Sequence, residues 1–204
     1  MRVLRAGGAA LLVETGDLAT AHRLNAALRN ARPHGVVDVV PGEQTVLVVA
    51  DPSADLDRLA ARIPKLRLPG DAEGDVDPVE IPVVYDGEDL DEVAALTGLS
   101  RDEVVRRHSA ASYTVAYLGF SPGFGYLSGL DPALHVARRE SPRTAVPAGS
   151  VAIAGPYAAV YPSRSPGGWR LLGHSGLPLW DVTRDPPSLL RPGMRVRFVP
   201  GGRS

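Results

Sequence analysis

The first 63 residues alternate between the apolar patterns of strands and those of helices. Short apolar or β-branched runs predict four strands, at residues 3–4, 11–14, 36–40 and 46–49. A helix is predicted after Asp17, a candidate N-cap, because the next apolar residues repeat on one helical face: Leu18, Ala21, Leu24 and Leu28. A second helix is predicted over residues 53–63, before Pro64. This order predicts a small α+β domain with its helices on one face of an antiparallel sheet.

Residues 64–78 carry no apolar period and are rich in proline, glycine and aspartate. Such a composition is typical of a linker between domains. We therefore predict an N-terminal domain over residues 1–78, with the linker near 64–78 at its end, and a second domain over residues 79–204.

The second domain is predicted to begin with a strand at residues 79–84. Two short helices are then predicted, at residues 89–97 and 101–108. Ser100 and Glu103 have the spacing of a capping box, in which both side chains satisfy free amides at the start of the second helix.

The pattern changes after residue 112 to short β-branched segments that glycine and proline separate. The strands predicted from these segments lie at residues 113–118, 151–154, 157–161, 169–172 and 195–199. Many short strands with turn residues between them are typical of a β-barrel or a sandwich.

The composition of the chain restricts the partners that it can bind and the reactions that it can catalyse. The 204 residues carry 22 Lys+Arg against 23 Asp+Glu, so no basic field is available to hold a nucleic acid. The chain has no cysteine, which excludes disulfides and thiolate chemistry and fits a cytoplasmic protein. No apolar run approaches the roughly 20 residues that a membrane helix needs. Acidic residues directly after the first apolar run argue against a signal peptide.

Several familiar motifs are incomplete. Residues 173–176 (GHSG) resemble a nucleophile elbow, but the pattern needs glycine where Leu177 stands. Lys65 is the only lysine and lies in the predicted linker, so no lysine serves a phosphate-binding loop. The five histidines lack the spacing of a metal site, and no metal is predicted. His22 and His108 are predicted at exposed helix positions.

Residues 120–180 combine dense glycine and proline with aromatic and polar side chains. Glycine and proline at this density are typical of the tight turns of a small barrel. Loops that they make rigid are also what a preorganised binding surface needs. The composition of this segment leaves both interpretations open.

Successive motifs in this segment resemble the signature blocks of a known family. They are residues 120–127 (FSPGFGYL), 141–143 (SPR), 146–155 (VPAGSVAIAG), 161–162 (YP) and 165–169 (SPGGW). In these blocks the chain is similar to the 5-oxoprolinase B-subunit family, also called Kip-type kinase inhibitor or allophanate hydrolase subunit 1. That family corresponds to part of the carboxyltransferase domain of urea carboxylase, subdomains C and D. The resemblance extends from about the first strand to residues 190–193 (LRPG).

The resemblance implies an α+β fold with two parts. The first is a small N-terminal α/β domain, which we expect to be ferredoxin-like. The second is a C-terminal cyclophilin-like β-barrel that carries the signature motifs. These two parts match the two patterns of the sequence.

The resemblance also implies a function. The chain would be the B component of an ATP-dependent 5-oxoprolinase complex, a lactam hydrolase that converts 5-oxo-L-proline to L-glutamate and is active only with its A and C components. ATP is then a co-substrate of the assembled complex, and no covalently bound cofactor is expected in this chain. Two alternatives stay open: an inhibitor of a sensor histidine kinase, and a carboxyltransferase component of the urea carboxylase or allophanate hydrolase type.

The residues that match the signature blocks form the predicted site. Arg143 is expected to pair with a carboxylate or phosphate, or else to form a surface ion pair, and Ser150 is expected to help to stabilise an oxyanion. His135, outside the blocks, is a candidate general base without a visible orienting partner. The residues expected to bind substrate or nucleotide are Pro122, Phe124, Tyr126, Pro147, Gly149, Ser165, Gly167, Gly168 and Trp169. For the aromatic residues among them, a place in the core or at an interface with another protein is the alternative.

The chain departs from the family pattern at a few positions. Gly125 stands where proline is common, and His174-Ser175 stand where Arg-Thr is typical. An imidazole is not permanently charged, as a guanidinium is. The replacement at position 174 therefore weakens any fixed anion contact there.

Overall fold

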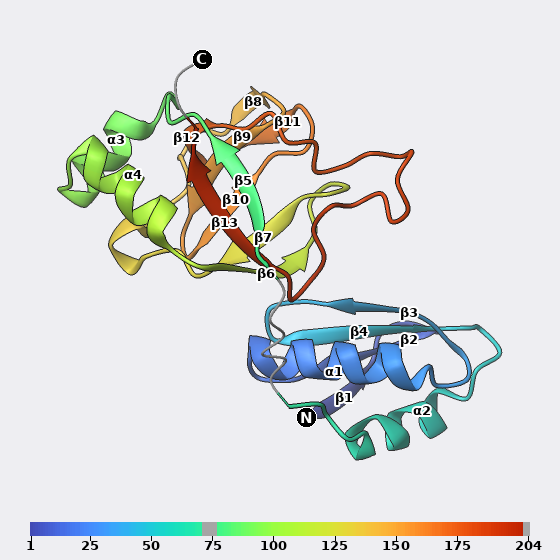
Figure 1. Ribbon diagram of the computed structural model, residues 1–204. Coiled ribbons are helices and arrows are strands. Elements are labelled where there is room, and N and C mark those ends of the chain that lie inside the picture. Colours follow the sequence, from blue (N-terminus) through green and yellow to red (C-terminus); the bar gives the residue numbers. More distant parts are fainter. Residues whose placement is uncertain (71–76, 202–204) are drawn as a thin grey trace. The chain divides into compact units, whose positions relative to one another are not determined.

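The computed structural model describes residues 1–70 and 77–201, which form two compact units, one within residues 1–75 and the other within residues 76–204 (Figure 1). The predicted linker includes residues 71–76, which lie outside the described residues. Its first part belongs to the first unit, because Leu66 and Leu68 pack against that unit's core.

The first unit is a four-stranded antiparallel sheet with two helices. In the order β1-β2-β4-β3, its strands are β1 (Arg2–Arg5), β2 (Ala10–Glu14), β4 (Thr45–Ala50) and β3 (Val36–Pro41). The helices are α1 (Leu18–Ala31) and α2 (Leu56–Arg62), and the short 3-10 helix η1 (Ile63–Lys65) follows.

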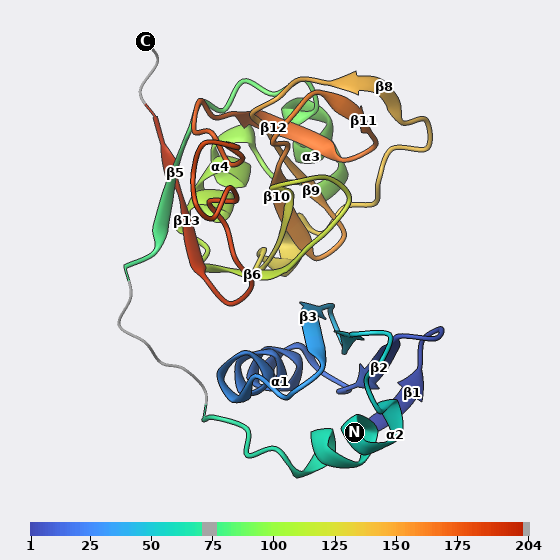
Figure 2. The same ribbon diagram turned by 90° about the vertical axis from the view of Figure 1, so that its right-hand side faces the viewer.

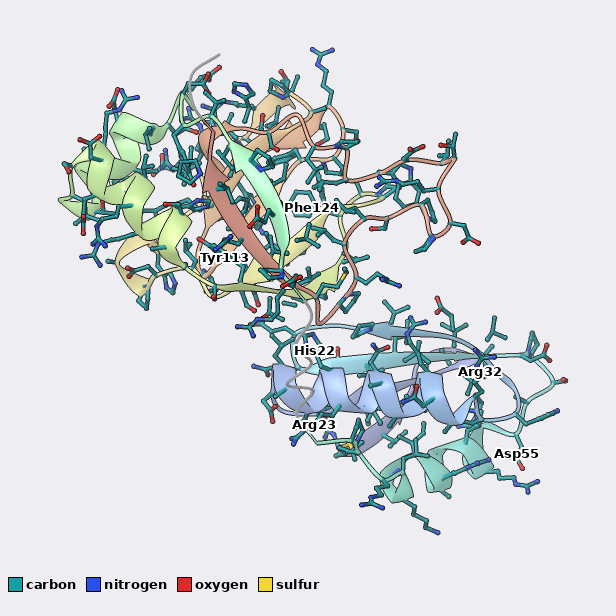
Figure 3. All side chains as sticks on the ribbon, viewed as in Figure 1. His22, Arg23, Arg32, Asp55, Tyr113 and Phe124 are labelled. Carbon is teal, nitrogen blue, oxygen red and sulfur yellow. The ribbon has the colours of Figure 1, made fainter. Side chains whose placement is uncertain are left out.

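Both helices bury apolar side chains against one face of this sheet. Alternate residues of a strand point to the same face, and in β4 Val46 and Val48 are fully buried against Leu24 and Leu28 of α1. The predicted cap is confirmed, because the Asp17 carboxylate accepts a hydrogen bond from the Thr20 N–H at 2.7 Å. Asp55 caps α2 in the same way, and Figure 3 labels it at the start of that helix.

The ferredoxin-like detail of the prediction is not confirmed. A ferredoxin-like domain runs βαββαβ along the chain, whereas the elements of this unit run ββαββα. The antiparallel sheet and the helices packed on it agree with the predicted α+β pattern.

The second unit is built on a nearly closed barrel. In the order β12-β9-β10-β7-β6-β13-β5, its seven strands are β12 (Arg170–His174), β9 (Ser150–Ala154), β10 (Tyr157–Val160), β7 (Gly125–Ser128), β6 (Tyr113–Leu118), β13 (Arg195–Pro200) and β5 (Val79–Val83). Backbone hydrogen bonds of 2.9 Å in both directions join Val84, just after β5, to His174 of β12. This bridge closes the ring and leaves little free strand edge.

A separate two-stranded ribbon lies against this barrel, formed by β8 (Arg143–Val146) and β11 (Ser165–Gly167), as Figure 2 shows. These two strands and β7 were not predicted. They have three or four residues each and contain glycine or proline, or lie beside them, so a period of two has no length in which to appear.

Two helices and a 3-10 turn complete the unit: α3 (Leu90–Thr97), α4 (Arg101–Ala110) and η2 (Pro132–Leu134). The capping box is confirmed only in its first half. The Ser100 hydroxyl accepts a hydrogen bond from the Glu103 N–H at 3.2 Å, but the Glu103 carboxylate instead accepts from Arg106 and Arg107. The two guanidiniums outcompete a single backbone amide for that carboxylate.

Strand β9 of the barrel buries both of its faces. Val151 and Ile153 of β9 point into the barrel core, with Tyr113, which Figure 3 labels. Ala152 and Ala154 of the same strand belong to a different apolar cluster, on the other face. Because β9 is covered on both faces, its residues 150–154 form a near-continuous apolar run in the sequence.

His108 is fully buried, so the predicted exposed position is wrong. It lies four residues after Val104, on the face of α4 that packs against β13. Its Nδ1 lies 2.8 Å from the Tyr85 hydroxyl, and its ring centroid lies 4.5 Å from that of Phe198. Its Nε2 is buried and has no hydrogen-bond partner within residues 1–70 and 77–201.

This histidine makes stability depend on pH. Burial lowers the pKa of His108 to about 3, whereas a histidine in an unfolded chain titrates near pH 6.5. Below that pH the unfolded chain binds a proton that the folded protein does not, so stability decreases as the pH falls. From pH 7 to pH 5 the free energy of unfolding should decrease by about 2 kcal/mol through this residue.

Urea titrations followed by tryptophan fluorescence measure this change, because both tryptophans, Trp169 and Trp180, lie in the second unit. His108→Asn should remove most of the decrease between pH 7 and pH 5. Between pH 7.5 and pH 8.5, where the buried imidazole is neutral in both states, the variant and the wild type should change equally. An unaltered decrease in the variant would contradict this origin of the pH dependence.

Candidate functional site

The signature segments come together on the outer face of the barrel, beside the β8–β11 ribbon. Residues 120–127 lead into β7, residues 146–155 run from the end of β8 through β9, and residues 165–169 contain β11. In the ribbon, Ser165 is paired with Val146 and Gly167 with Arg143. Loops distant in the sequence therefore present their side chains to a common region.

An aromatic cluster lies at the centre of this face. The Phe124 ring is buried, and its centroid lies 5.2–5.6 Å from those of four rings, all in edge-to-face contact: Phe120, Tyr126, Tyr161 and Trp169. Edge-to-face pairs add to the stability that burial gives. The structure thus brings together three predicted residues, Phe124, Tyr126 and Trp169. Phe124 and Trp169 are core residues of the cluster, and Tyr126 is only half-buried.

Tyr161 fixes the ribbon to this cluster. The Trp169 N–H donates a hydrogen bond to the Tyr161 hydroxyl, and burial raises the pKa of that hydroxyl, which keeps it neutral. A Cβ atom at Gly167 would collide with the same hydroxyl oxygen. Gly167 is therefore required for this close approach.

Next to the cluster lies a buried ion pair centred on Asp89. The Asp89 side chain is 3% exposed and accepts hydrogen bonds from Arg143 at 2.7 and 3.0 Å and from Arg139 at 2.8 Å. It also accepts one from the Leu171 N–H at 2.7 Å. Burial opposes ionisation, but the hydrogen bonds from Arg143 and Leu171 outweigh it and hold the pKa of Asp89 below its ordinary value.

Arg143 is thus held in one orientation. Its hydrogen bonds to Asp89 are bidentate, and a third bond of 3.1 Å goes to Glu88. A guanidinium has five N–H donors, so two are left for another ligand. The sequence left open that Arg143 forms a surface ion pair. Its ion pair with Asp89 is instead mostly buried.

Gly149, expected from the sequence to bind substrate or nucleotide, has a structural role in the fold. Its N–H donates to the Tyr161 carbonyl oxygen at 2.7 Å, and its φ is +81°. A Cβ there would collide with the Ser175 carbonyl oxygen. Ser150, the next residue, is buried at the start of β9, while Pro147 is exposed.

Two serine hydroxyls on this face have no hydrogen-bond partner among the residues that the structure describes. The Oγ atoms of Ser121 and Ser165 are buried and make no hydrogen bond within the described residues. A buried hydroxyl without a partner destabilises the folded state. Such groups are therefore candidates to bond a ligand. Pro122, beside Ser121, is exposed, and Gly168 is buried, with its carbonyl oxygen accepting the Arg139 N–H at 2.8 Å.

His135 is not brought to the other predicted residues by any described contact. It follows η2, which packs on α3 and α4. Its Nε2 lies 3.2 Å from the Leu130 carbonyl oxygen, and its electrostatic neighbour is Asp131. Its role as a general base stays a prediction.

The sequence did not single out Asp89 or Arg139. Asp89 precedes a helix, which is the ordinary place of an N-cap, but its side chain makes no capping hydrogen bond. Its partners are 50 and 54 residues away in the chain. Only the presence of arginines in and beside the signature blocks could have indicated that a buried acid was required.

His174 takes part in closing the barrel. Its backbone pairs with Val84, and its exposed Nδ1 lies 2.9 Å from an Asp86 carboxylate oxygen. Ser175 is buried, and its N–H donates to the Gly149 carbonyl oxygen at 2.8 Å. Position 174 thus has a carboxylate neighbour, which disfavours an anionic ligand there.

Residues 1–70 and 77–201 contain no group of three or more His, Asp or Glu side chains placed to hold a metal ion. No helix among them is long and apolar enough to cross a membrane.

Comparison with known proteins gives the family. Residues 1–190 match the family model "Carboxyltransferase domain, subdomain C and D". The chain is 40% identical over 173 residues to the B subunit of 5-oxoprolinase from Haemophilus influenzae, covering 82% of this chain and 80% of that protein. It is 57% identical over 125 residues to the B subunit of 5-oxoprolinase from Escherichia coli O157:H7, covering 60% of this chain and 57% of that protein. The chain belongs to the carboxyltransferase domain, subdomain C and D family, and its relatives include these 5-oxoprolinase components.

Comparison with solved structures agrees with this family assignment. The crystal structure of TTHA0988 matches with a TM-score of 0.85 and 40% identity, over 96% of this chain and 41% of that one. Urea carboxylase of Kluyveromyces lactis matches with a TM-score of 0.72 and 22% identity, over 98% of this chain and 22% of that one, which shows the shared fold. The chain spans less than two thirds of the E. coli relative and of TTHA0988.

Asp89 should be the residue of this site on which stability depends most. Asp89→Asn removes the charge that compensates Arg143 and Arg139, so the free energy of unfolding should decrease by about 3 kcal/mol. Urea titration measures it. Asp91→Asn is the matched control, because Asp91 forms an exposed ion pair with Arg101, and it should cost less than about 1 kcal/mol. Equal effects of the two substitutions would contradict the central place of Asp89.

Proposed function

We propose that this chain is the B component of an ATP-dependent 5-oxoprolinase, which opens 5-oxo-L-proline to L-glutamate only together with its A and C components. The observation that carries the proposal is the 40% identity to the B subunit of a 5-oxoprolinase over 82% of this chain. Side chains from each of the longer signature segments, among them Phe124, Ala152 and Trp169, also lie together on one face of one unit.

The chemistry explains why ATP is needed. A lactam carbonyl is stabilised by resonance, and its ring nitrogen is a poor leaving group. Transfer of a phosphoryl group from ATP to the amide oxygen makes the carbonyl carbon electrophilic. Water then attacks this carbon and the C–N bond of the ring breaks, so that the ring nitrogen leaves as the amine and the carbon is left as an acyl phosphate. A second water hydrolyses this acyl phosphate, which releases inorganic phosphate and leaves the carboxylate of glutamate. The protein contributes by positioning the reactants and by stabilising negative charge.

The outer face of the barrel offers groups for these tasks. Arg143, oriented by Asp89, has two donors left for a carboxylate or phosphate. Ser165 has a hydroxyl without a partner in the described chain, which suits it to an oxyanion. Tyr126 presents a half-buried ring that can cover the apolar part of a small ring compound. Two further predicted residues have weaker support. Ser150 is supported only by its place in a signature block, and His135 only by the ability of a histidine to act as a base.

The alternatives have less support. The match to urea carboxylase is 22% identical and carries the fold alone. A match to a urea amidolyase of Saccharomyces cerevisiae is 32% identical over 54% of this chain. The inhibitor of a histidine kinase stays a prediction from the family resemblance, and so does the cytoplasmic location.

A reconstitution tests the proposal. We expect glutamate release from 5-oxoproline only when this chain, a homologue of the C component from the same genome, the A component and ATP are all present. Leaving out each of them in turn provides the controls. Activity of the A and C components without this chain, or of this chain alone, would contradict the proposal. A stable complex with the C component that releases no glutamate when the A component and ATP are added would show that the substrate is wrong.

Ser165→Ala separates function from stability. Because the buried hydroxyl makes no hydrogen bond within the described residues, its loss should not destabilise the chain and should raise the free energy of unfolding by about 1 kcal/mol. Loss of one oxyanion donor typically decreases kcat about 100-fold, and we expect this decrease in the reconstituted complex. Ser163→Ala, an exposed serine two residues away, should change neither quantity. Full activity of Ser165→Ala would remove this residue from the site.

A further inference from the structure

Phe120 is exposed and held in a strained conformation. Its φ is +66°, in the left-handed region, and the residue is 61% exposed. An aromatic residue in that region is a genuine outlier, and such strain persists at binding sites, where the surrounding structure holds it. Burial does not explain the conformation, because most of the ring faces solvent.

The turn that follows holds Phe120 in place. The Phe124 N–H donates to the Ser121 carbonyl oxygen at 3.0 Å, and the Gly119 N–H donates to the Phe124 carbonyl oxygen at 3.2 Å. The Phe120 ring also meets the buried Phe124 ring edge to face, with centroids 5.2 Å apart. The exposed ring is thus mounted on the rigid aromatic cluster of the candidate site.

A second loop brings apolar side chains to the turn that follows Phe120. The long connection between β12 and β13, red in Figure 1, projects from the barrel and carries Trp180 and Val182, 37% and 79% exposed. A Cβ at Gly123 would lie 2.9 Å from the Trp180 Cβ, so the two loops touch. A backbone hydrogen bond of 3.0 Å from Asp181 to Pro187 orders the projecting loop.

These features are those of a protein-binding surface. Exposed aromatic residues in rigid loops are enriched at interfaces, because they bury a large area while losing little conformational entropy. The buried Ser121 hydroxyl, next to Phe120, has no hydrogen-bond partner in the described residues and is available to one that a partner brings. We name Phe120, Trp180 and Val182 the aromatic edge.

The match to TTHA0988 indicates what covers the aromatic edge. In TTHA0988 the matching region is 41% of a single polypeptide, so well over half of that chain lies outside it. On the proposed function, the equivalent of that remainder is a separate protein, the C component. Its contact with the aromatic edge would lie at the rim of the candidate site, because Phe120 contacts Phe124 and Tyr161.

We propose that the aromatic edge is the docking surface for the partner protein equivalent to the remainder of TTHA0988, which on the proposed function is the C component. Docking there covers the rim of the signature face. It completes the site from outside this chain, which explains why the chain would need a partner for activity. The partner should present an apolar pocket that accepts the Phe120 and Trp180 side chains.

The test is affinity between the purified chain and the C component, measured by isothermal titration calorimetry, with glutamate release measured in parallel. Phe120→Asn is the main variant, because asparagine tolerates the left-handed region and removes the strain. We expect at least 10-fold weaker binding with an unchanged or higher free energy of unfolding. Trp180→Ser should weaken binding in the same way, and it keeps the test independent of the Phe120 backbone.

Leu96→Ser is the matched control, because Leu96 is 57% exposed but lies on α3, outside the aromatic edge. It should bind as the wild type does. Wild-type affinity of both Phe120→Asn and Trp180→Ser would overturn the docking surface while the proposed function stands. Absence of any complex with the wild-type chain would overturn both. Self-association of the chain alone, lost in both variants, would assign the surface to a second copy and overturn it too.

Discussion

The buried carboxylate of Asp89 joins parts of the second unit that are far apart in the sequence. It lies at the start of α3, binds Arg139 and Arg143 near the β8–β11 ribbon, and accepts the Leu171 N–H of β12. The adjacent backbone, from Val84 onward, closes the barrel against β12. Because a buried charge is tolerated only when it is compensated, the helix, the ribbon and the barrel hold one another in position.

The candidate site depends on this rigid frame of α3, the β8–β11 ribbon and the barrel. The ribbon carries Ser165 and Gly167, and the closeness of Gly167 to the Tyr161 hydroxyl sets its distance from the aromatic cluster. A rigid frame can hold features that are individually unfavourable, such as the strained Phe120 backbone and buried hydroxyls without partners in the described residues. These features lie at or near the face that the signature motifs form, and they make it suited to a substrate and a partner.

Much of this arrangement could be predicted from local pattern. The helix at Leu18–Ala31 and its Asp17 cap follow from apolar spacing and cap chemistry, which act over a few residues. The motifs of residues 120–169 marked the face that carries the candidate site. The roles of single residues were harder to predict, because Phe124 and Trp169 are buried, and Gly149 uses its N–H within the fold. Short strands such as β11 gave no signal, since three residues contain no period.

The sequence by itself determined the family, the α+β character and the segments that carry the chemistry, because periodicity, caps and motifs are properties of neighbouring residues. Only the tertiary structure decided which charged side chains pair with one another and which rings are buried. It assigned Asp89 to Arg143, 54 residues away, instead of to a helix cap, and it buried His108 between α4 and β13. Pairing over such distances depends on which surfaces the closed barrel brings together, and no local pattern encodes that choice.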